Sequence, residues 1–131
     1  PDTDYPMFRL ADIYLMYAEA VLRGGNGGDE STALGYVNAI RNRAYGGNSG
    51  EISADQLTTD FILAERGREL QWEGTRRTDL IRYGLFTGDS YKWAWKGGVK
   101  DGVAVEDYRN LMPIPNSDLV ANPNLVQNPG Y

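Results

Sequence analysis

The sequence contains no cysteine and no histidine. These absences exclude disulfides, thiol nucleophiles, zinc sites of the usual kind and the side chain most often used as a general base near neutral pH. The chain also lacks an 18-residue apolar run, and it opens at Pro1 without a charged-then-apolar signal region. We therefore expect a processed or excised piece of a longer protein, with any export signal or lipid anchor lying upstream.

Basic residues are also few. The chain has 13 Lys and Arg residues against 18 Asp and Glu, for a net charge of −5. Nucleic acids and anionic membrane surfaces are poor partners, because binding to them requires a basic field. The Asp and Asn residues show no EF-hand spacing, and we predict neither a metal site nor another cofactor.

Apolar residues recur every three or four positions over residues 8–23, which predicts an amphipathic helix. A glycine-rich connection follows, and Asp29 or Ser31 can cap a second helix that runs to about Ala44. The pair, residues 8–46, is similar to a tetratricopeptide-like helical pair. No second copy follows, so we expect the pair to pack on helices outside this chain.

The remaining residues predict a mainly α fold that ends in an irregular, loop-rich segment. In residues 55–84, a helix capped by Thr58 or Thr59 should stop at Gly74, and a shorter one should cover 76–83. In residues 85–131, the Asp101-Gly102 pair favours a short β-hairpin within an aromatic loop. Four prolines then impose an extended tail with one helical turn at 117–121. We expect residues 1–131 to act as a single unit.

Charged residues are densest between positions 65 and 82. Arginine outnumbers lysine ten to three in the chain, and guanidinium is well suited to bidentate pairing with carboxylates. We predict no catalytic residue here, but a set of structural ion pairs: Glu65, Arg66, Arg68, Glu69, Glu73, Arg76, Arg77, Asp79 and Arg82.

An enzymatic alternative also rests on this segment. Glu65, Glu69 and Glu73 are spaced by four residues, so a continuous helix would carry them as one acidic strip. A glycosidase could use Glu69 and Glu73 as its two carboxylates. The neighbouring arginines disfavour this alternative, because they would hold the carboxylates ionised.

Aromatic side chains gather between Tyr83 and Tyr108. Flat rings with polar edges can stack on sugar rings, and Tyr91, Trp93 and Trp95 are the candidates for ligand binding. The same rings could instead pack onto the helices, or form a protein interface.

An ordered set of short motifs resembles the C-terminal region of the SusD/RagB family. No single motif is specific, but the set covers essentially the whole chain. Its elements are Arg9-Leu10-Ala11-Asp12, Tyr17-Ala18-Glu19-Ala20, Asn38-Ala39-Ile40-Arg41-Asn42-Arg43-Ala44, Glu65-Arg66, Glu69-Leu70, Glu73-Gly74, Asp79-Leu80-Ile81-Arg82, Trp95-Lys96-Gly97-Gly98, Pro113-Ile114-Pro115, Asn122-Pro123-Asn124-Leu125 and Gln127-Asn128-Pro129-Gly130-Tyr131.

The resemblance implies a helical, non-enzymatic lipoprotein at the surface of the outer membrane, held by a lipid anchor upstream of this chain. Such proteins capture glycans for a SusC-like TonB-dependent transporter. Some members of the family capture peptides, which is the alternative within the binding class. A tetratricopeptide-like scaffold that grips a partner protein is a third hypothesis.

Overall fold

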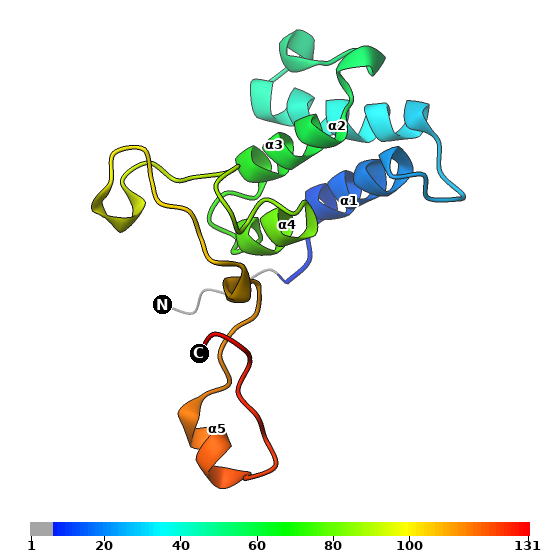
Figure 1. The fold of residues 1–131 in the computed structure, drawn as a ribbon. Coiled ribbons are helices and arrows are strands. Elements are labelled where there is room, and N and C mark those ends of the chain that lie inside the picture. The colour runs from blue at the N-terminus through cyan, green and yellow to red at the C-terminus, as the bar shows by residue number, and fades with distance from the viewer. Residues whose placement is uncertain (1–6) are drawn as a thin grey trace, which may run out of the picture. The chain divides into compact units, whose positions relative to one another are not determined.

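The computed structural model describes residues 7–131. Within them the chain forms α1 (Leu10–Leu22), α2 (Glu30–Tyr45), α3 (Thr59–Glu69), α4 (Arg76–Arg82) and α5 (Asn116–Ala121), joined by loops and short 3₁₀ turns (Figure 1). This part of the chain contains no β-strand. The prediction of a mainly α fold is confirmed. None of these helices combines the length and apolar character needed to cross a membrane.

The chain divides into two compact units, Pro1–Arg76 and Arg77–Tyr131. The first unit contains α1, α2 and α3, while the second contains the aromatic loop and the proline-rich tail. The interface with the rest of a longer protein, which the sequence analysis expects, stays a prediction.

The first unit is built on the antiparallel pair α1 and α2 (Figure 1). As predicted, Asp29 caps α2: its carboxylate accepts from the Thr32 backbone N–H at 2.8 Å and from the Thr32 hydroxyl at 2.7 Å. Ala18 and Ala33 are fully buried between the two helices, where their small side chains permit close approach. Tyr14 and Tyr36 stack across the pair with ring centroids 4.1 Å apart.

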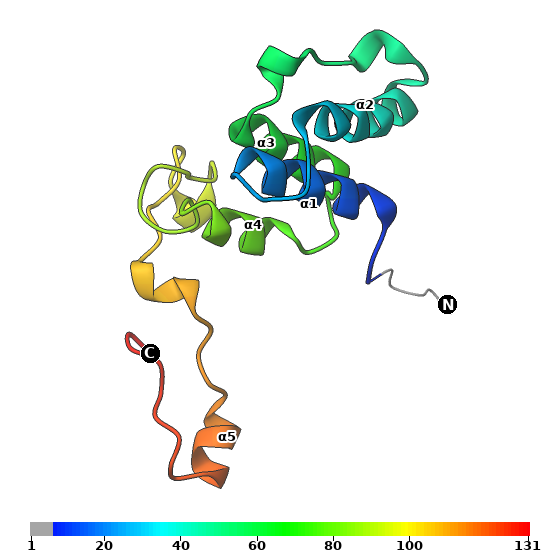
Figure 2. The ribbon, with the colours of Figure 1, turned by 90° about the vertical axis from the view of Figure 1, so that its right-hand side faces the viewer.

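Helix α3 packs against α1 and completes the core of this unit (Figure 2). Thr58 caps it by accepting from the Phe61 backbone N–H at 3.1 Å, in agreement with the sequence. The core is small, and its buried apolar side chains are Leu15, Ala18, Ala33, Val37, Ile40, Ile52, Leu57 and Ile62.

Helix α3 ends at Glu69, so the prediction of a helix that continues to Gly74 is wrong. In a continued helix the Glu69 carbonyl would accept from the Glu73 N–H. Instead that carbonyl accepts from the Arg9 guanidinium at 2.5 Å, and Glu73 donates to Leu70 in a tight turn. Trp72 lies in this turn with a left-handed φ of 71°. Glu65 and Glu69 therefore share a helix, and Glu73 does not.

The β-hairpin across residues 93–105 does not form in the structure. Trp95, Gly97 and Gly98 all have positive φ, and residues Lys96–Gly98 make a 3₁₀ turn. Such backbone angles are incompatible with a strand. The turn beside Asp101 is closed by the Gly102 N–H and the Val99 carbonyl, and an isolated bridge pairs Gly88 with Val105.

The proline-rich tail contains the one predicted helical turn, α5, within the second unit. Side chains tie the two sides of the tail together where prolines prevent backbone pairing. The Gln127 amide accepts from the Ile114 N–H at 2.8 Å and donates to the Ile114 carbonyl at 2.9 Å. Tyr131 donates to the Leu111 carbonyl at 2.9 Å.

In the first unit, Asn38 binds both backbone groups of a single residue, Ile52. Its amide accepts from the Ile52 N–H at 2.9 Å and donates to the Ile52 carbonyl at 3.0 Å. Asn38→Ala removes both partners from the backbone of a buried residue, so we expect a loss of about 1–3 kcal/mol in the free energy of unfolding. Urea unfolding of the full-length protein, with the exposed Asn26→Ala as the matched control, measures it. Equal midpoints for the two variants would contradict the role assigned to Asn38.

Candidate functional site

Arg9 is the centre of a charged network in the first unit. Its Nη1 lies 2.6 Å from Glu69, and its Nε and Nη2 lie 2.8 Å and 2.7 Å from the two carboxylate oxygens of Glu73. Glu69 also accepts from Arg43 of α2 at 2.5 Å. A single guanidinium thus fills the space between the two carboxylates that a glycosidase would need.

A second set of ion pairs lies along α3. Glu65, whose side chain is buried, accepts from Arg41 of α2 at 2.9 Å and from Arg68 at 2.5 Å. Arg66, also buried, pairs with Asp12 of α1 at 2.8 Å. Charges from α3 therefore reach both neighbouring helices.

The other four predicted ion-pair residues, Arg76, Arg77, Asp79 and Arg82, lie in α4. Arg82 pairs with Asp79 at 2.9 Å. Arg76 donates to the Leu63 carbonyl at 2.8 Å. Arg77 donates to the carbonyls of Arg109 and Asn110, at 2.8 Å and 3.2 Å. Arginine therefore serves backbone carbonyls as well as carboxylates here.

Four residues of these networks lie outside the set of ion-pair residues predicted from the sequence. They are Arg9, Asp12, Arg41 and Arg43. Their partners lie 24 to 64 positions away along the chain, beyond any local spacing rule. The available signal was the excess of arginine over lysine, since fixed pairs favour guanidinium.

The electrostatics of the Arg9 cluster oppose acid–base chemistry. Hydrogen bonds from Arg9 hold the pKa of Glu73 below its ordinary value of 4.5, against a smaller opposing effect of burial. The same pairing, chiefly with Glu73, raises the pKa of Arg9. A general acid needs a carboxyl group whose pKa is raised toward neutrality, and Glu73 is shifted in the opposite direction.

The second unit contains a closed aromatic loop, which we define as residues 86–105. The Gly88–Val105 bridge closes its base with hydrogen bonds of 2.8 Å and 3.1 Å. Further along, Gly102 has a φ of +77° and a Cβ there would collide with the Trp93 carbonyl oxygen. Only glycine fits this close approach of the two sides of the loop. The Trp95 N–H donates to the Lys100 carbonyl at 3.3 Å, which joins the two sides.

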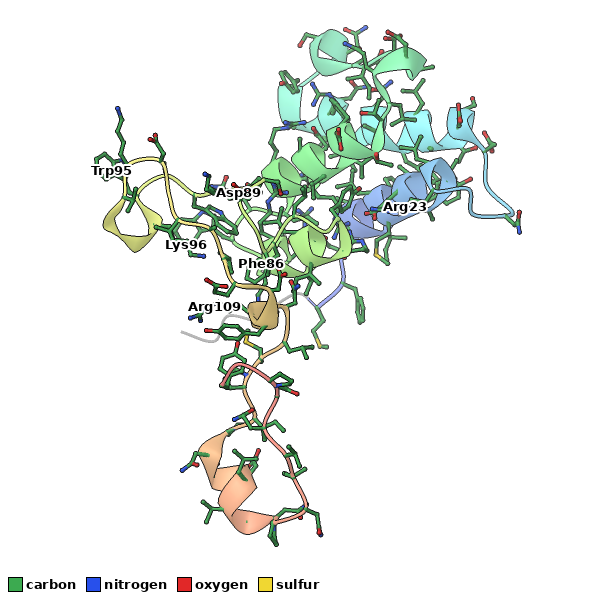
Figure 3. All side chains as sticks on the ribbon, viewed as in Figure 1. Arg23, Phe86, Asp89, Trp95, Lys96 and Arg109 are labelled. Carbon is green, nitrogen blue, oxygen red and sulfur yellow. The ribbon has the colours of Figure 1, made fainter. Side chains whose placement is uncertain are left out.

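The three predicted ligand-binding aromatics have different surroundings in this loop. Tyr91 meets Trp93 edge to face, with ring centroids 5.0 Å apart, and Trp93 meets Phe86 in the same manner at 6.1 Å. The Lys96 ammonium lies 4.2 Å from the centre of the Trp93 ring. Trp95 is 68% exposed and projects outward from the loop (Figure 3). Of the three, Trp95 is the one with a ring surface open to a ligand.

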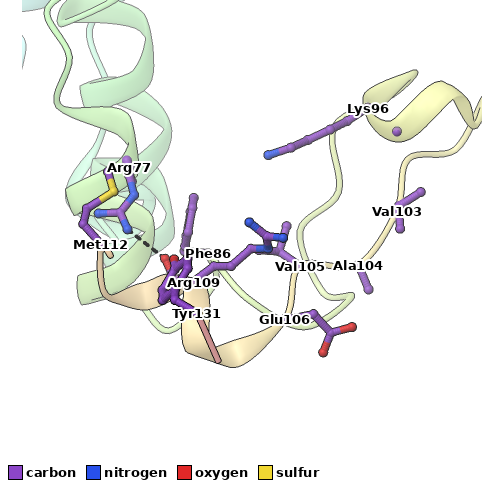
Figure 4. A pocket seen from close by; sticks show the side chains of 11 residues that line it. Arg77, Phe86, Lys96, Val103, Ala104, Val105, Glu106, Arg109, Met112 and Tyr131 are labelled. Atoms are coloured by element: carbon purple, nitrogen blue, oxygen red, sulfur yellow. Dashed lines mark hydrogen bonds between the residues drawn. The ribbon is translucent and has the colours of Figure 1, made fainter. Parts of the chain in front are cut away.

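A hollow of about 450 Å³ lies next to the aromatic loop, within the second unit. Phe86, Lys96, Arg109 and Tyr131 line it, together with Arg77 and a rim from Val103 to Glu106 (Figure 4). It combines an aromatic side chain with convergent charged groups, which is the usual composition of a small-ligand site.

Comparisons with known proteins decide the family. The model of the SusD family matches residues 2–131. The chain belongs to the SusD family. It is 46% identical over its whole length to the starch-binding protein SusD of Bacteroides thetaiotaomicron, and 33% identical over 95% of its length to the SusD-like protein P25 of Formosa agariphila.

The chain is also similar to two solved structures. A SusD superfamily protein from Bacteroides vulgatus matches 95% of the chain with a TM-score of 0.69 and 34% identity. A surface glycan-binding protein A from Bacteroides uniformis matches 95% of the chain with a TM-score of 0.68 and 29% identity. The chain spans 22% and 24% of the two sequence relatives and 27% of each structure.

Glu69 forms ion pairs with both Arg9 and Arg43. Glu69→Gln leaves two guanidinium groups facing a neutral amide, so we expect the free energy of unfolding to fall by about 1–3 kcal/mol while ligand affinity stays unchanged. Thermal unfolding and a ligand titration of the full-length protein measure the two effects, with the exposed Glu30→Gln as the control. Unchanged stability with lost affinity would assign Glu69 to a ligand site instead.

The lowered pKa of Glu73 predicts how stability depends on pH. Because the folded-state pKa lies below the ordinary value, the stabilisation from Glu73 is complete above pH of about 4.5 and is lost as the pH falls through the lowered value. Glu73→Gln should therefore reduce stability at neutral pH and flatten its fall in acid. Unfolding curves at a series of pH values test this expectation, and parallel curves for the two proteins would refute it.

Proposed function

We propose that the full-length protein is a non-catalytic glycan-binding protein at the cell surface. The observation that carries the proposal is the 46% identity, over the whole chain, to a starch-binding protein of the same family. The structural likeness to a surface glycan-binding protein supports the same ligand class. We propose polysaccharides or oligosaccharides as ligands, without naming the sugar.

The charged network supports a binding role over a catalytic one. A retaining or inverting glycosidase needs two carboxyl groups flanking the scissile bond, one of them protonated. Here Arg9 lies between Glu69 and Glu73 and holds Glu73 ionised. There is no space for a sugar between these carboxylates while the guanidinium occupies it.

The chain also has a face suited to packing against the rest of a longer protein. Leu10, Ile13 and Met16 are exposed along one side of α1, at the spacing of three that places side chains on one helical face. Phe8, just before the helix, is 79% exposed. We propose that the upstream part of the polypeptide covers this face, since the chain spans only about a quarter of its relatives.

The proposed role has a partner and a location. We propose that the glycan is passed to a SusC-like TonB-dependent transporter, and that an upstream lipid anchor holds the protein on the outer membrane. The family relationship supports both assignments.

The test is a glycan array run beside a panel of oligopeptides, with the full-length protein. We expect saturable binding to a glycan, no release of reducing sugar, and no binding to peptides. Trp95→Ala should weaken binding about threefold to tenfold if the exposed ring stacks on a sugar, and Trp95→Tyr should retain most of the affinity.

Each contrary result names a different alternative. Binding to peptides alone would assign the protein to the peptide-capturing class. Release of reducing sugar that is abolished by Glu73→Gln would make it a glycosidase. Capture of the transporter without affinity for any glycan would leave only a scaffold. Identical affinities for the Trp95 variants and the parent protein would remove Trp95 from the binding surface.

A further inference from the structure

The hollow of the second unit has an electrostatic character opposite to that of the chain. The protein is acidic overall, but among residues 7–131 the charged side chains that line the hollow are Arg77, Lys96, Arg109 and Glu106. Figure 4 shows the Glu106 carboxylate directed away from the ends of Lys96 and Arg109. The space between these two cations and Phe86 is therefore locally positive.

Cationic side chains lie on both sides of Phe86. On one side the Arg77 guanidinium lies 4.8 Å from the ring centre and is held by the Arg109 and Asn110 carbonyls. On the other side Lys96 and Arg109 extend toward the hollow (Figure 4). Arg77 thereby covers one side of the Phe86 ring, Trp93 meets the ring edge to face, and the ring borders the hollow.

Lys96 and Arg109 differ from the arginines of the first unit in what they contact. Arg9, Arg41, Arg43 and Arg66 each lie within 3 Å of a carboxylate. Within residues 7–131, the contacts of the Lys96 and Arg109 side chains are with the rings of Trp93 and Tyr108. A cation resting on an aromatic ring keeps donors free to bind an anion.

We propose that this hollow is a subsite for the carboxylate of an acidic sugar, with a uronic acid unit seated on Phe86. The C–H face of the pyranose ring packs on the phenyl ring, and the carboxylate accepts hydrogen bonds from Lys96 and Arg109. The hollow, at about 450 Å³, lies within the range of small-ligand pockets. This assignment rests on the proposed glycan binding and narrows it to glycans that contain carboxylate groups.

The assignment favours a sugar over a peptide carboxylate because the cations lie beside an aromatic ring. Charge alone would bind any carboxylate, whereas a ring surface next to the charge selects a ligand with a flat apolar face joined to the anion. A uronic acid has this combination within one unit.

The experiment compares an acidic glycan with its neutral form. Oligogalacturonate and oligoglucuronate, each with its methyl ester, are titrated by calorimetry into the full-length protein, and a peptide with a free C-terminal carboxylate is a further ligand. We expect one of the acidic oligosaccharides to bind about tenfold more tightly than its ester, since a charge-assisted hydrogen bond is lost on esterification. This preference should decline as the ionic strength rises.

Variants of the two cations that line the hollow test whether the preference for the acid arises there. Lys96→Met and Arg109→Met should each abolish the preference for the acid over the ester and leave the melting temperature unchanged, and Lys96→Arg should retain it. Lys92→Met, on the same loop as Lys96 but outside the hollow, is the matched control and should bind as the parent protein does.

The outcomes separate this proposal from the broader one. Tight binding of neutral glycans with no preference for the acids overturns the subsite and leaves glycan binding intact. Equal or better binding of the peptide carboxylate also overturns it. Failure to bind any glycan overturns the proposed function together with the subsite. A preference for the acid that survives in Lys96→Met and Arg109→Met places the acidic site elsewhere in the protein.

Discussion

The arrangement of the three N-terminal helices depends on the contacts of Arg9. Its guanidinium binds the carboxylates of Glu69 and Glu73. It also donates to the Glu69 carbonyl, replacing the backbone N–H that would bind this carbonyl if the helix continued. Arg9 immediately precedes α1 and Glu69 ends α3, so this contact fixes one end of each helix. Because Glu69 also pairs with Arg43, a single carboxylate connects all three helices.

Ion pairs help to hold α1, α2 and α3 together, because the apolar core of the first unit is small. Two of the residues between α1 and α2 are alanines, Ala18 and Ala33, and alanine contributes little apolar area. Buried ion pairs add only modestly to stability, since desolvation offsets much of their attraction, but breaking one is costly. Such pairs suit a unit whose helices must keep a fixed register. The pairing also makes Glu73 a poor candidate for a general acid, because the hydrogen bonds from Arg9 lower its pKa.

Local signals in the sequence were enough to predict most of the helices. Asp29 and Thr58 cap α2 and α3 as predicted, because a cap depends on residues three positions apart. The two wrong predictions failed for different reasons, one involving a distant residue and one involving local backbone angles. The sequence favoured a helix that continues past Glu69. In the structure Arg9, 60 positions away, donates to the Glu69 carbonyl, and the helix ends there. The hairpin looked favourable until Trp95 and two glycines adopted left-handed angles.

Periodicity and composition could place Tyr91, Trp93 and Trp95 in one aromatic segment, but not say which ring stays open. That choice depends on Lys96 covering Trp93 and on Gly102 crossing the Trp93 backbone.

The second unit shows how a loop without strands can still present side chains in fixed positions. The Gly88–Val105 bridge closes the base of the loop, and a hydrogen bond from the Trp95 N–H to the Lys100 carbonyl joins its two sides near Gly102. A protein that binds without catalysis gains affinity mainly by holding its contacts in the bound geometry beforehand, because less conformational entropy is then lost on binding. Arg77 applies the same principle to a side chain. It donates to two carbonyls and lies against the Phe86 ring, so the proposed subsite has its aromatic surface positioned by contacts within the second unit.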